Sequence, residues 1–298
     1  MKASIISAVL TLLERLTGKR FLYYTPSEAN ELGMTAVWSK FGFWYTGNVY
    51  DSNDIAYGIA QNGEVEPEET ALVNHILGVI SKDKTPVVYD IGANTGYYSI
   101  LAASLHSARV YSFEPLPEHL TCLTSSSHLN RVEDNITMYQ TALSDTDEER
   151  DFYLGGSGSS FDPLFLGNAS AKHIKVRSTQ LDALRQKEKI NLPDFVKIDV
   201  EGSEYAVLRG AIETIGAALP VLFIEIASTL REHNRGFVHH DYEKIFELLA
   251  SLGYKSFILD GGLRQVTADD RRDGVHMYLF LATKSPSHRP LLATLGNI

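Results

Sequence analysis

The sequence predicts an α/β fold with a largely parallel sheet that carries helices on both faces. Runs of apolar and β-branched residues alternate with helix-like stretches, which is typical of parallel strands joined by helices. The runs are almost continuously apolar, as expected when both faces of a sheet are buried. The expected strands span residues 87–91, 110–113, 136–143, 195–200 and 221–226, followed by two late strands, 255–259 and 275–282, that pair antiparallel at an edge.

The first 62 residues are expected to form an N-terminal extension. Apolar residues recur at helical spacing within residues 1–20 and predict an amphipathic helix. Charged residues interrupt this stretch and a small-residue cleavage pattern is missing, which disfavours a signal peptide. The helix could dock on this protein's own core, on a second subunit in a homo-oligomer, or on a membrane surface. Residues 21–62 are rich in aromatic side chains and predict either a cap over an acceptor pocket or a cover for the sheet.

The remaining chain divides into a domain over residues 63–285 and a tail over residues 286–298. A helix is expected through residues 72–80, which stops before Pro86. The charge run 145–151 and the Gly/Ser-rich run 155–160 predict a flexible surface insertion, and a lid over a ligand is the alternative.

Composition excludes several classes of function. The chain of 298 residues is 44% hydrophobic and 21% charged, which is ordinary for a globular protein. Its single cysteine, Cys122, rules out an intramolecular disulfide and Cys-based zinc sites, and suits the reducing cytoplasm. The formal charge of −10 disfavours a nucleic-acid substrate. No segment approaches the roughly twenty apolar residues of a membrane span.

A glycine-containing turn follows the first strand of the predicted sheet, in the segment DIGANTGYYS, residues 90–99. The spacing of Gly92 and Gly96 differs from the G-x-G-x-x-G turn that binds dinucleotides. Asp90, at the strand end, would repel a pyrophosphate but suits a cationic or hydroxyl-bearing ligand. S-adenosylmethionine carries a sulfonium, an ammonium group and ribose hydroxyls. The turn therefore favours this cofactor over a dinucleotide.

Glu114 lies at the end of the next strand, about twenty residues after the turn. An acidic residue at this position accepts hydrogen bonds from ribose hydroxyls. The alternative is an acid at the N-terminus of the helix that starts near Pro117. Glu114 and the glycine turn together imply an adenosine ligand.

Carboxylates also follow the later strands. Asp199 and Glu201 end the strand at 195–200, and Glu225 ends the next one. Ligands of open α/β sheets bind outside the carboxyl ends of the strands, so these residues are expected at the site. Ser203 is expected to cap the following helix.

These segments resemble the FkbM family of S-adenosylmethionine-dependent O-methyltransferases. The resemblance rests on DIGANTGYYS, Glu114-Pro115, the segments 141–145 and 179–182, and KIDVEGSEYAVLRGA at 197–211, and it spans roughly residues 50–285. It implies a class I methyltransferase (Rossmann-like) fold with a seven-stranded mixed sheet, and methyl transfer to a hydroxyl of a sugar, glycan or natural product. The residues expected to bind the cofactor are Asp90, Gly92, Asn94, Gly96, Glu114 and Asp145.

Methyl transfer to a hydroxyl requires removal of its proton. Asp199 or Glu201 could take it, and Asp199 with Glu225 could hold Mg²⁺, which would lower the pKa of the hydroxyl. His233 is the histidine expected to act as a base on the acceptor side. His239 and His240 point oppositely if the chain is extended there, so we expect a helix start rather than a metal site. His173, Lys175 and Arg177 alternate with apolar residues and predict an exposed strand face.

Two other functions remain open on the sequence alone. A nicotinamide-dependent oxidoreductase is disfavoured because G-x-G-x-x-G is missing. A non-catalytic nucleotide-binding or partner-binding protein is disfavoured by the acidic residues at three strand ends.

Overall fold

The computed structural model describes residues 34–52, 54–155, 158–167, 171–230, 237–259, 262–285, 288 and 291. The helix expected over residues 1–20, with its possible role in a homo-oligomer, lies outside this range, as do His233 and most of the expected tail. Within the described residues, helices that combine the length and apolarity of a membrane span do not occur.

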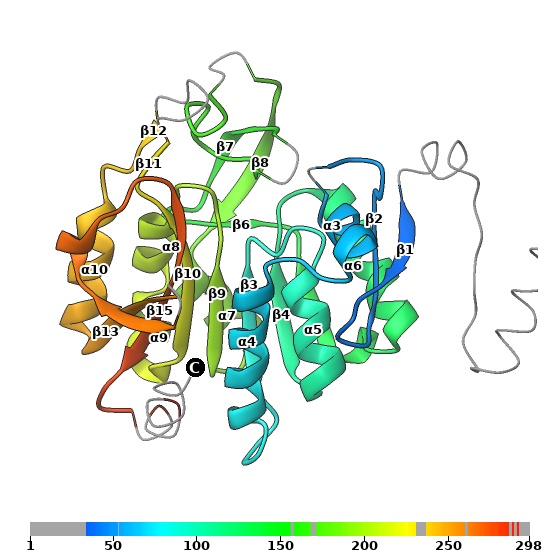
Figure 1. The fold of residues 1–298 in the computed structure, drawn as a ribbon. Coiled ribbons are helices and arrows are strands. Elements are labelled where there is room, and N and C mark those ends of the chain that lie inside the picture. The colour runs from blue at the N-terminus through cyan, green and yellow to red at the C-terminus, as the bar shows by residue number, and fades with distance from the viewer. Residues whose placement is uncertain are drawn as a thin grey trace, which may run out of the picture.

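A mixed sheet forms the centre of the molecule (Figure 1), with eight strands in the part of the chain that is described, in the order β14-β13-β15-β10-β9-β3-β4-β5. Strands β3, β4, β5, β9 and β10 are parallel to one another, and β15 is antiparallel to its neighbours β10 and β13. The bounds are β3 Val87–Ile91, β4 Arg109–Phe113, β5 Ile136–Tyr139, β9 Phe195–Ile198, β10 Val221–Ala227, β13 Tyr254–Leu259, β14 Leu263–Val266 and β15 Val275–Ala282. The predicted α/β class is confirmed.

The sheet differs from the expected seven strands at one edge. The two late strands do pair antiparallel, but β15 lies inside the sheet, and the additional strand β14 pairs with β13 at the edge. The burial of the strands explains this order. The last five residues of β15 are buried, whereas β14 exposes Arg264 and Gln265, which an edge strand tolerates.

The expected strand over 136–143 is interrupted. After β5, the chain turns at Thr141, whose hydroxyl donates to the Arg177 carbonyl at 3.1 Å. Strand β6, Ala142–Leu143, then joins a second sheet with β8, His173–Thr179, and β7, Glu148–Tyr153. The apolar run 136–143 therefore contributes one strand to each of two sheets.

The charge run 145–151 is not a loop throughout, because β7 begins within it at Glu148. Its charges face opposite charges on β8: Asp151 lies opposite Lys175, with their side chains 2.9 Å apart, and Glu149 lies opposite Arg177. Cross-strand pairs of this kind stabilise a strand that propensity alone disfavours. The exposed face predicted for His173, Lys175 and Arg177 is confirmed.

Helices cover both faces of the main sheet. Helices α4 (Pro67–Ile80), α5 (Tyr97–His106) and α6 (Pro117–Asn130) pack on one face, and α7 (Leu181–Glu188), α8 (Glu204–Gly210), α9 (Ile212–Ala218) and α10 (Tyr242–Ser251) cover the other. Side chains alternate along each strand, so Val88 and Phe195 join the first hydrophobic core, and Tyr89 and Val196 join the second.

The described part of the N-terminal extension packs on α5 and α6. It consists of β1 (Thr35–Trp38), β2 (Trp44–Gly47) and α3 (Ile55–Asn62). Phe43 and Tyr45 are fully buried in the first core. Asn130 accepts from the Trp44 N–H at 2.8 Å and donates to its carbonyl at 2.6 Å. These aromatic residues therefore share the core of the domain.

Two short elements complete the described chain. Strands β11 (Thr229–Leu230) and β12 (Phe237–Val238) pair antiparallel on either side of the residues that are not described. His288 and Leu291 are both buried, and His288 accepts a hydrogen bond from the Ala282 N–H at 2.8 Å.

Candidate functional site

The candidate site lies at the carboxyl ends of the parallel strands. Asp90 of β3, Lys197 of β9 and Glu225 of β10 all project toward the face that α4 and α5 cover, because each is an even number of positions from a residue of the first core. Asp199 extends β9, since its N–H donates to the Ile91 carbonyl at 3.0 Å. Strand pairing thus brings together carboxylates that are far apart in the sequence.

Asp90 is buried beneath this site. One of its carboxylate oxygens accepts from the Ser99 hydroxyl at 2.6 Å, and within the described residues the other has no hydrogen-bond partner. Burial raises the pKa of Asp90, and the nearby Lys197 ammonium opposes that shift. Asp90 is not among the residues that line the cavity described below, so its contact with a cofactor stays a prediction.

The glycines of the turn are required by close packing. Gly92 has a φ of +74°, and a Cβ there would lie 1.8 Å from the Asp199 carbonyl oxygen. Gly96 precedes α5 with a φ of +90°, and a Cβ there would lie 2.3 Å from Leu123 Cδ1. Close packing and positive φ angles therefore explain why both positions are glycine. Of the two, only Gly92 lines the cavity described next.

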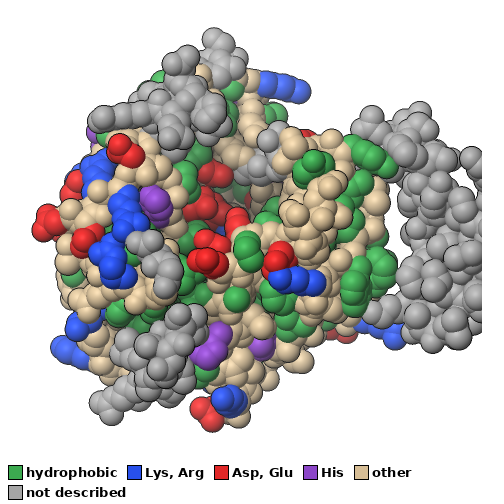
Figure 2. Space-filling view, viewed as in Figure 1, with side chains coloured by type: hydrophobic (Ala, Val, Ile, Leu, Met, Phe, Trp, Pro, Cys, Tyr) green, Lys and Arg blue, Asp and Glu red, His purple; other side chains and the backbone are tan. Residues whose placement is uncertain are grey.

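A cavity of about 580 Å³ opens above the turn. Its polar lining includes Gly92, Asn94 and Glu114, which follow β3 and β4, and Asp199 and Glu201, which follow β9. Its apolar lining comes from the residue before α6, from β6, from β7 and from the loop that follows β7: Leu116, Leu143, Phe152 and Phe161. Figure 2 shows acidic side chains around a hollow at the centre of the view.

Glu114 is held rigidly at the edge of this cavity. Its Oε2 accepts from the Asn94 N–H at 2.9 Å, and its Oε1 accepts from the Leu116 N–H at 3.0 Å and lies 3.2 Å from His119 Nδ1. A carboxylate has about four acceptor sites, so capacity remains for a ligand hydroxyl. His119 also lines the cavity, and the sequence analysis did not find it.

The Gly/Ser-rich run forms part of the cavity wall. Ser160 is fully buried, and its hydroxyl donates to the Glu201 carbonyl at 2.6 Å. Ser159 lines the cavity beside Phe152 and Phe161. The expectation of an exposed surface loop is therefore wrong for Ser159 and Ser160. The lid hypothesis agrees with their position, and Gly156 and Ser157 lie outside the described residues.

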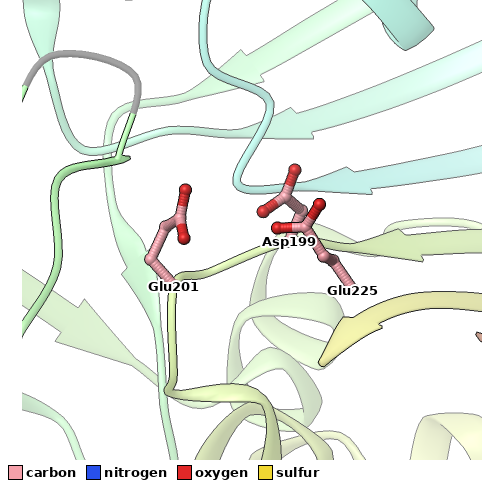
Figure 3. Close-up of side chains that lie close together, drawn as sticks. All are labelled: Asp199, Glu201 and Glu225. Carbon is pink, nitrogen blue, oxygen red and sulfur yellow. The ribbon is translucent and has the colours of Figure 1, made fainter. Parts of the chain in front are cut away.

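Asp199, Glu201 and Glu225 form a carboxylate cluster, in which one oxygen from each residue lies within 4.8 Å of the others. In Figure 3 the Asp199 and Glu225 carboxylates lie side by side, and Glu201 projects from the loop after β9. Burial, together with the charges of Asp199 and Glu201, raises the pKa of Glu225 well above its ordinary value. This carboxyl group therefore retains its proton more readily than an exposed glutamate.

Lys197 supplies positive charge to the cluster. Its Nζ lies 2.8 Å from Asp199 Oδ2 and 5.0 Å from the centre of the Tyr98 ring. Burial opposes the lysine's charge, but the surrounding carboxylates, Asp199 above all, outweigh it and raise the pKa of Lys197. The three carboxylates could also ligate a divalent cation. Because Lys197 already balances Asp199, the geometry does not require a metal.

The comparison with protein families decides the class of this site. A family model described as the methyltransferase FkbM domain matches residues 90–256, which include the glycine turn, Glu114 and the carboxylate cluster. The chain belongs to the FkbM methyltransferase family. The matched range is narrower than the 50–285 expected from the motifs, and it leaves α3, α4, β14 and β15 outside.

This FkbM methyltransferase is also similar to individual proteins. It is 27% identical over 136 residues to the hexuronic acid methyltransferase AglP of Haloferax volcanii, which covers 43% of this chain and 51% of that protein. The chain thus spans about half the length of this relative.

Two solved structures illustrate the structural neighbours. A methyltransferase FkbM from Methylobacillus flagellatus has a TM-score of 0.41 at 18% identity, covering 65% of this chain and 43% of the other. An O-methyltransferase from Bacillus cereus in complex with SAH has a TM-score of 0.43 at 15% identity, covering 92% and 96%.

The segment after the cluster anchors the FkbM methyltransferase site through buried hydrogen bonds of Glu204. Glu204 accepts from the Gly202 N–H at 2.9 Å with one oxygen, and its other oxygen lies 2.9 Å from His239 Nε2. Ser203 occupies the N-cap position of α8, but its side chain makes no capping hydrogen bond. His239 is buried while His240 is exposed, which confirms that the two histidines point apart.

Asp145 is not among the residues that line this cavity. Its Oδ2 is 3.2 Å from Arg209 Nη1, an interaction that ties the chain after β6 to α8. This contact gives Asp145 a structural role, and its contact with a cofactor stays a prediction.

Proposed function

We propose that this FkbM methyltransferase transfers a methyl group from S-adenosylmethionine to a hydroxyl group of a sugar, glycan or natural product. The observation that carries the proposal is the cavity between Glu114 and the carboxylate cluster, which joins a hydroxyl-binding acid to candidate proton acceptors. A cytoplasmic location and a small-molecule or glycan acceptor belong to the same proposal.

The residues of the first cavity fit S-adenosylmethionine. Glu114 has acceptor capacity for ribose hydroxyls, and the apolar side chains Leu116, Phe152 and Phe161 suit a purine ring. Asp199 and Glu201, which also line this cavity, favour positively charged groups of a ligand. When bound, the cofactor would supply the methyl group in an activated, positively charged form.

The carboxylate cluster would accept the proton of the acceptor hydroxyl. The raised pKa of Glu225 makes its ionised form a stronger base than an ordinary glutamate. Lys197, at 2.8 Å from Asp199, stabilises the charge of that neighbour and fixes its orientation. We assign proton removal to Asp199, Glu201 or Glu225 acting as a group. His233 remains a candidate base outside the described residues.

The proposed acceptor class has support from a relative. AglP is a hexuronic acid methyltransferase, which supports a sugar as the acceptor. The carboxylate cluster suits a hydroxyl target because it offers several proton acceptors at one point.

Calorimetry tests the cofactor assignment. The protein is expected to bind S-adenosylmethionine and not NAD. Glu114→Ala should weaken cofactor binding by about 1–3 kcal/mol, the range for hydrogen bonds to a charged group. Glu118→Ala is the matched control, because Glu118 is exposed on the first turn of α6. Equal affinities of the two variants would remove Glu114 from cofactor binding.

Turnover tests the catalytic assignment. The protein is incubated with methyl-labelled S-adenosylmethionine and a panel of hydroxylated sugars, lipids and secondary metabolites. Asp199→Asn and Glu201→Gln are expected to lower the turnover of a methylated acceptor while cofactor affinity stays near that of the wild type. A variant that loses cofactor affinity but keeps its turnover at saturating cofactor would contradict the assignment.

A further inference from the structure

A second cavity, of about 460 Å³, lies next to the carboxylate cluster. Glu66 and Glu69, from the start of α4, form one side of it, and Glu225 of β10 forms another. Side chains of β13 and β15 complete the lining, including Ile258 and Met277. The Tyr98 hydroxyl donates to Glu66 Oε2 at 2.7 Å and fixes this carboxylate.

Glu225 connects the two cavities. It lines the second cavity, whereas Asp199 and Glu201 line the first. Since oxygens of all three lie within 4.8 Å of one another, a hydroxyl that enters from the second cavity reaches the cluster. The first cavity would then hold the cofactor and the second would hold the acceptor.

Acidic side chains surround this junction, and the imidazole of His276 also lines the second cavity. Burial raises the pKa of Glu66 and of Glu225, so these two carboxyl groups carry less negative charge than exposed glutamates. Carboxylates come from α4, β9 and β10, and neither Lys nor Arg occurs among the described residues that line the two cavities. The ammonium of Lys197 is already paired with Asp199. Recognition of a ligand carboxylate ordinarily uses an Arg fork or a Lys ammonium. A uronic acid would find neither in these linings and would be repelled by the carboxylates.

We propose that the second cavity is the acceptor subsite and that it selects an uncharged or amine-bearing sugar over a uronic acid. This inference rests on the proposed function. The apolar side chains of β13 and β15 cover the C–H face of the sugar ring, and the carboxylates of Glu66 and Glu69 accept hydrogen bonds from its hydroxyls or amine. The sugar preference thus differs from the acid named for the relative AglP.

Matched acceptors test the selectivity. Methyl glucoside, methyl glucosaminide and methyl glucuronide differ mainly in charge, and each is incubated with the protein and labelled S-adenosylmethionine. The expected kcat/KM is at least about tenfold higher for the uncharged or amine-bearing sugar than for the glucuronide, equivalent to about 1.4 kcal/mol. Equal or faster methylation of the glucuronide overturns the inference and leaves the proposed function intact.

A second measurement reads the charge of the cavity without any acceptor. Met277 lines the second cavity, whereas Met138 lies on β5, the edge strand on the far side of β9, β3 and β4. With ¹³C-labelled methionine methyls, a cationic nitroxide should enhance the relaxation of Met277 at least about twofold more than an anionic nitroxide does, relative to Met138. A ratio for Met277 no larger than that for Met138 overturns the inference.

Variants of α4 locate the source of the charge. Glu69→Gln should reduce the nitroxide preference at Met277, and Glu68→Gln should not, because Glu68 belongs to the same helical turn but does not line the cavity. Equal effects of the two variants would contradict a role for Glu69. A protein that methylates none of the three sugars would count against the proposed function, while the nitroxide ratio would still decide the charge of the cavity.

Discussion

Replacement of Gly92 by alanine should be far more costly than its small volume suggests. The added Cβ would lie 1.8 Å from the Asp199 carbonyl oxygen, and real Cβ atoms do not approach closer than about 3.0 Å, so the loop after β9 must move by at least 1.2 Å. Left-handed backbone costs an alanine roughly 1–2 kcal/mol, and overpacking adds about 1–3 kcal/mol. The expected loss is therefore about 3 kcal/mol of unfolding free energy, measured by urea denaturation.

Gly253→Ala provides the matched control for this prediction. Gly253 also has a positive φ, +87°, but a Cβ there would have no neighbouring atom within 4 Å. Only the backbone term of about 1 kcal/mol should appear in this variant. If the two variants lose the same stability, the contact between Gly92 and Asp199 does not constrain the turn.

Three further perturbations follow from the burial of particular side chains. The pKa of Glu225 is raised in the folded protein, so the stability of the wild type should fall as the pH rises from the unfolded pKa, near 4.5, through the folded pKa. Glu225→Gln should therefore have a higher melting temperature than the wild type at pH 8. Below pH 4.5 the variant should have no advantage. Burial lowers the pKa of His288 from 6.5 to about 4, so the unfolding free energy should drop by about 3 kcal/mol as the pH falls from 6.5 to 4, and His288→Gln should flatten this slope in urea titrations. Trp44→Ala should lower the unfolding free energy by about 1–3 kcal/mol, because it removes the contact with the Trp38 ring, whose centre lies 5.1 Å away. The KM of a verified acceptor should stay unchanged. A raised KM would place Trp44 at the acceptor.

Much of the site could be predicted because strand ends are visible in the sequence. An apolar run followed by an acid locates Asp199 and Glu225, and parallel pairing then places them together. Lys197 was overlooked because it lies within such an apolar run. A charged side chain in an apolar run is ordinarily expected to face solvent. Its carboxylate partners come from neighbouring strands, and only the strand register reveals them.

Other parts of the site depend on packing that has no local signal. His119, Phe152 and Ser159 line the first cavity from a helix, a strand and a loop whose own patterns predict surface positions. The sequence of β7 is highly charged and does not predict a strand, because its charges are paired with those of β8 only in the folded protein. The turn at Thr141 divides one apolar run between two sheets. Tertiary contacts determine all of these positions.

The contact between the Tyr45 hydroxyl and the Thr95 hydroxyl joins the hairpin of β1 and β2 to the glycine turn, although 50 residues separate them. Tyr45 is fully buried, and the neighbouring Thr46 N–H donates to Ser126 of α6 at 2.9 Å. Local opening of the hairpin therefore breaks contacts of the turn as well, so the two segments belong to one cooperative unit of amide exchange. A ligand held by the turn is therefore expected to protect backbone amides of β2 that it does not contact.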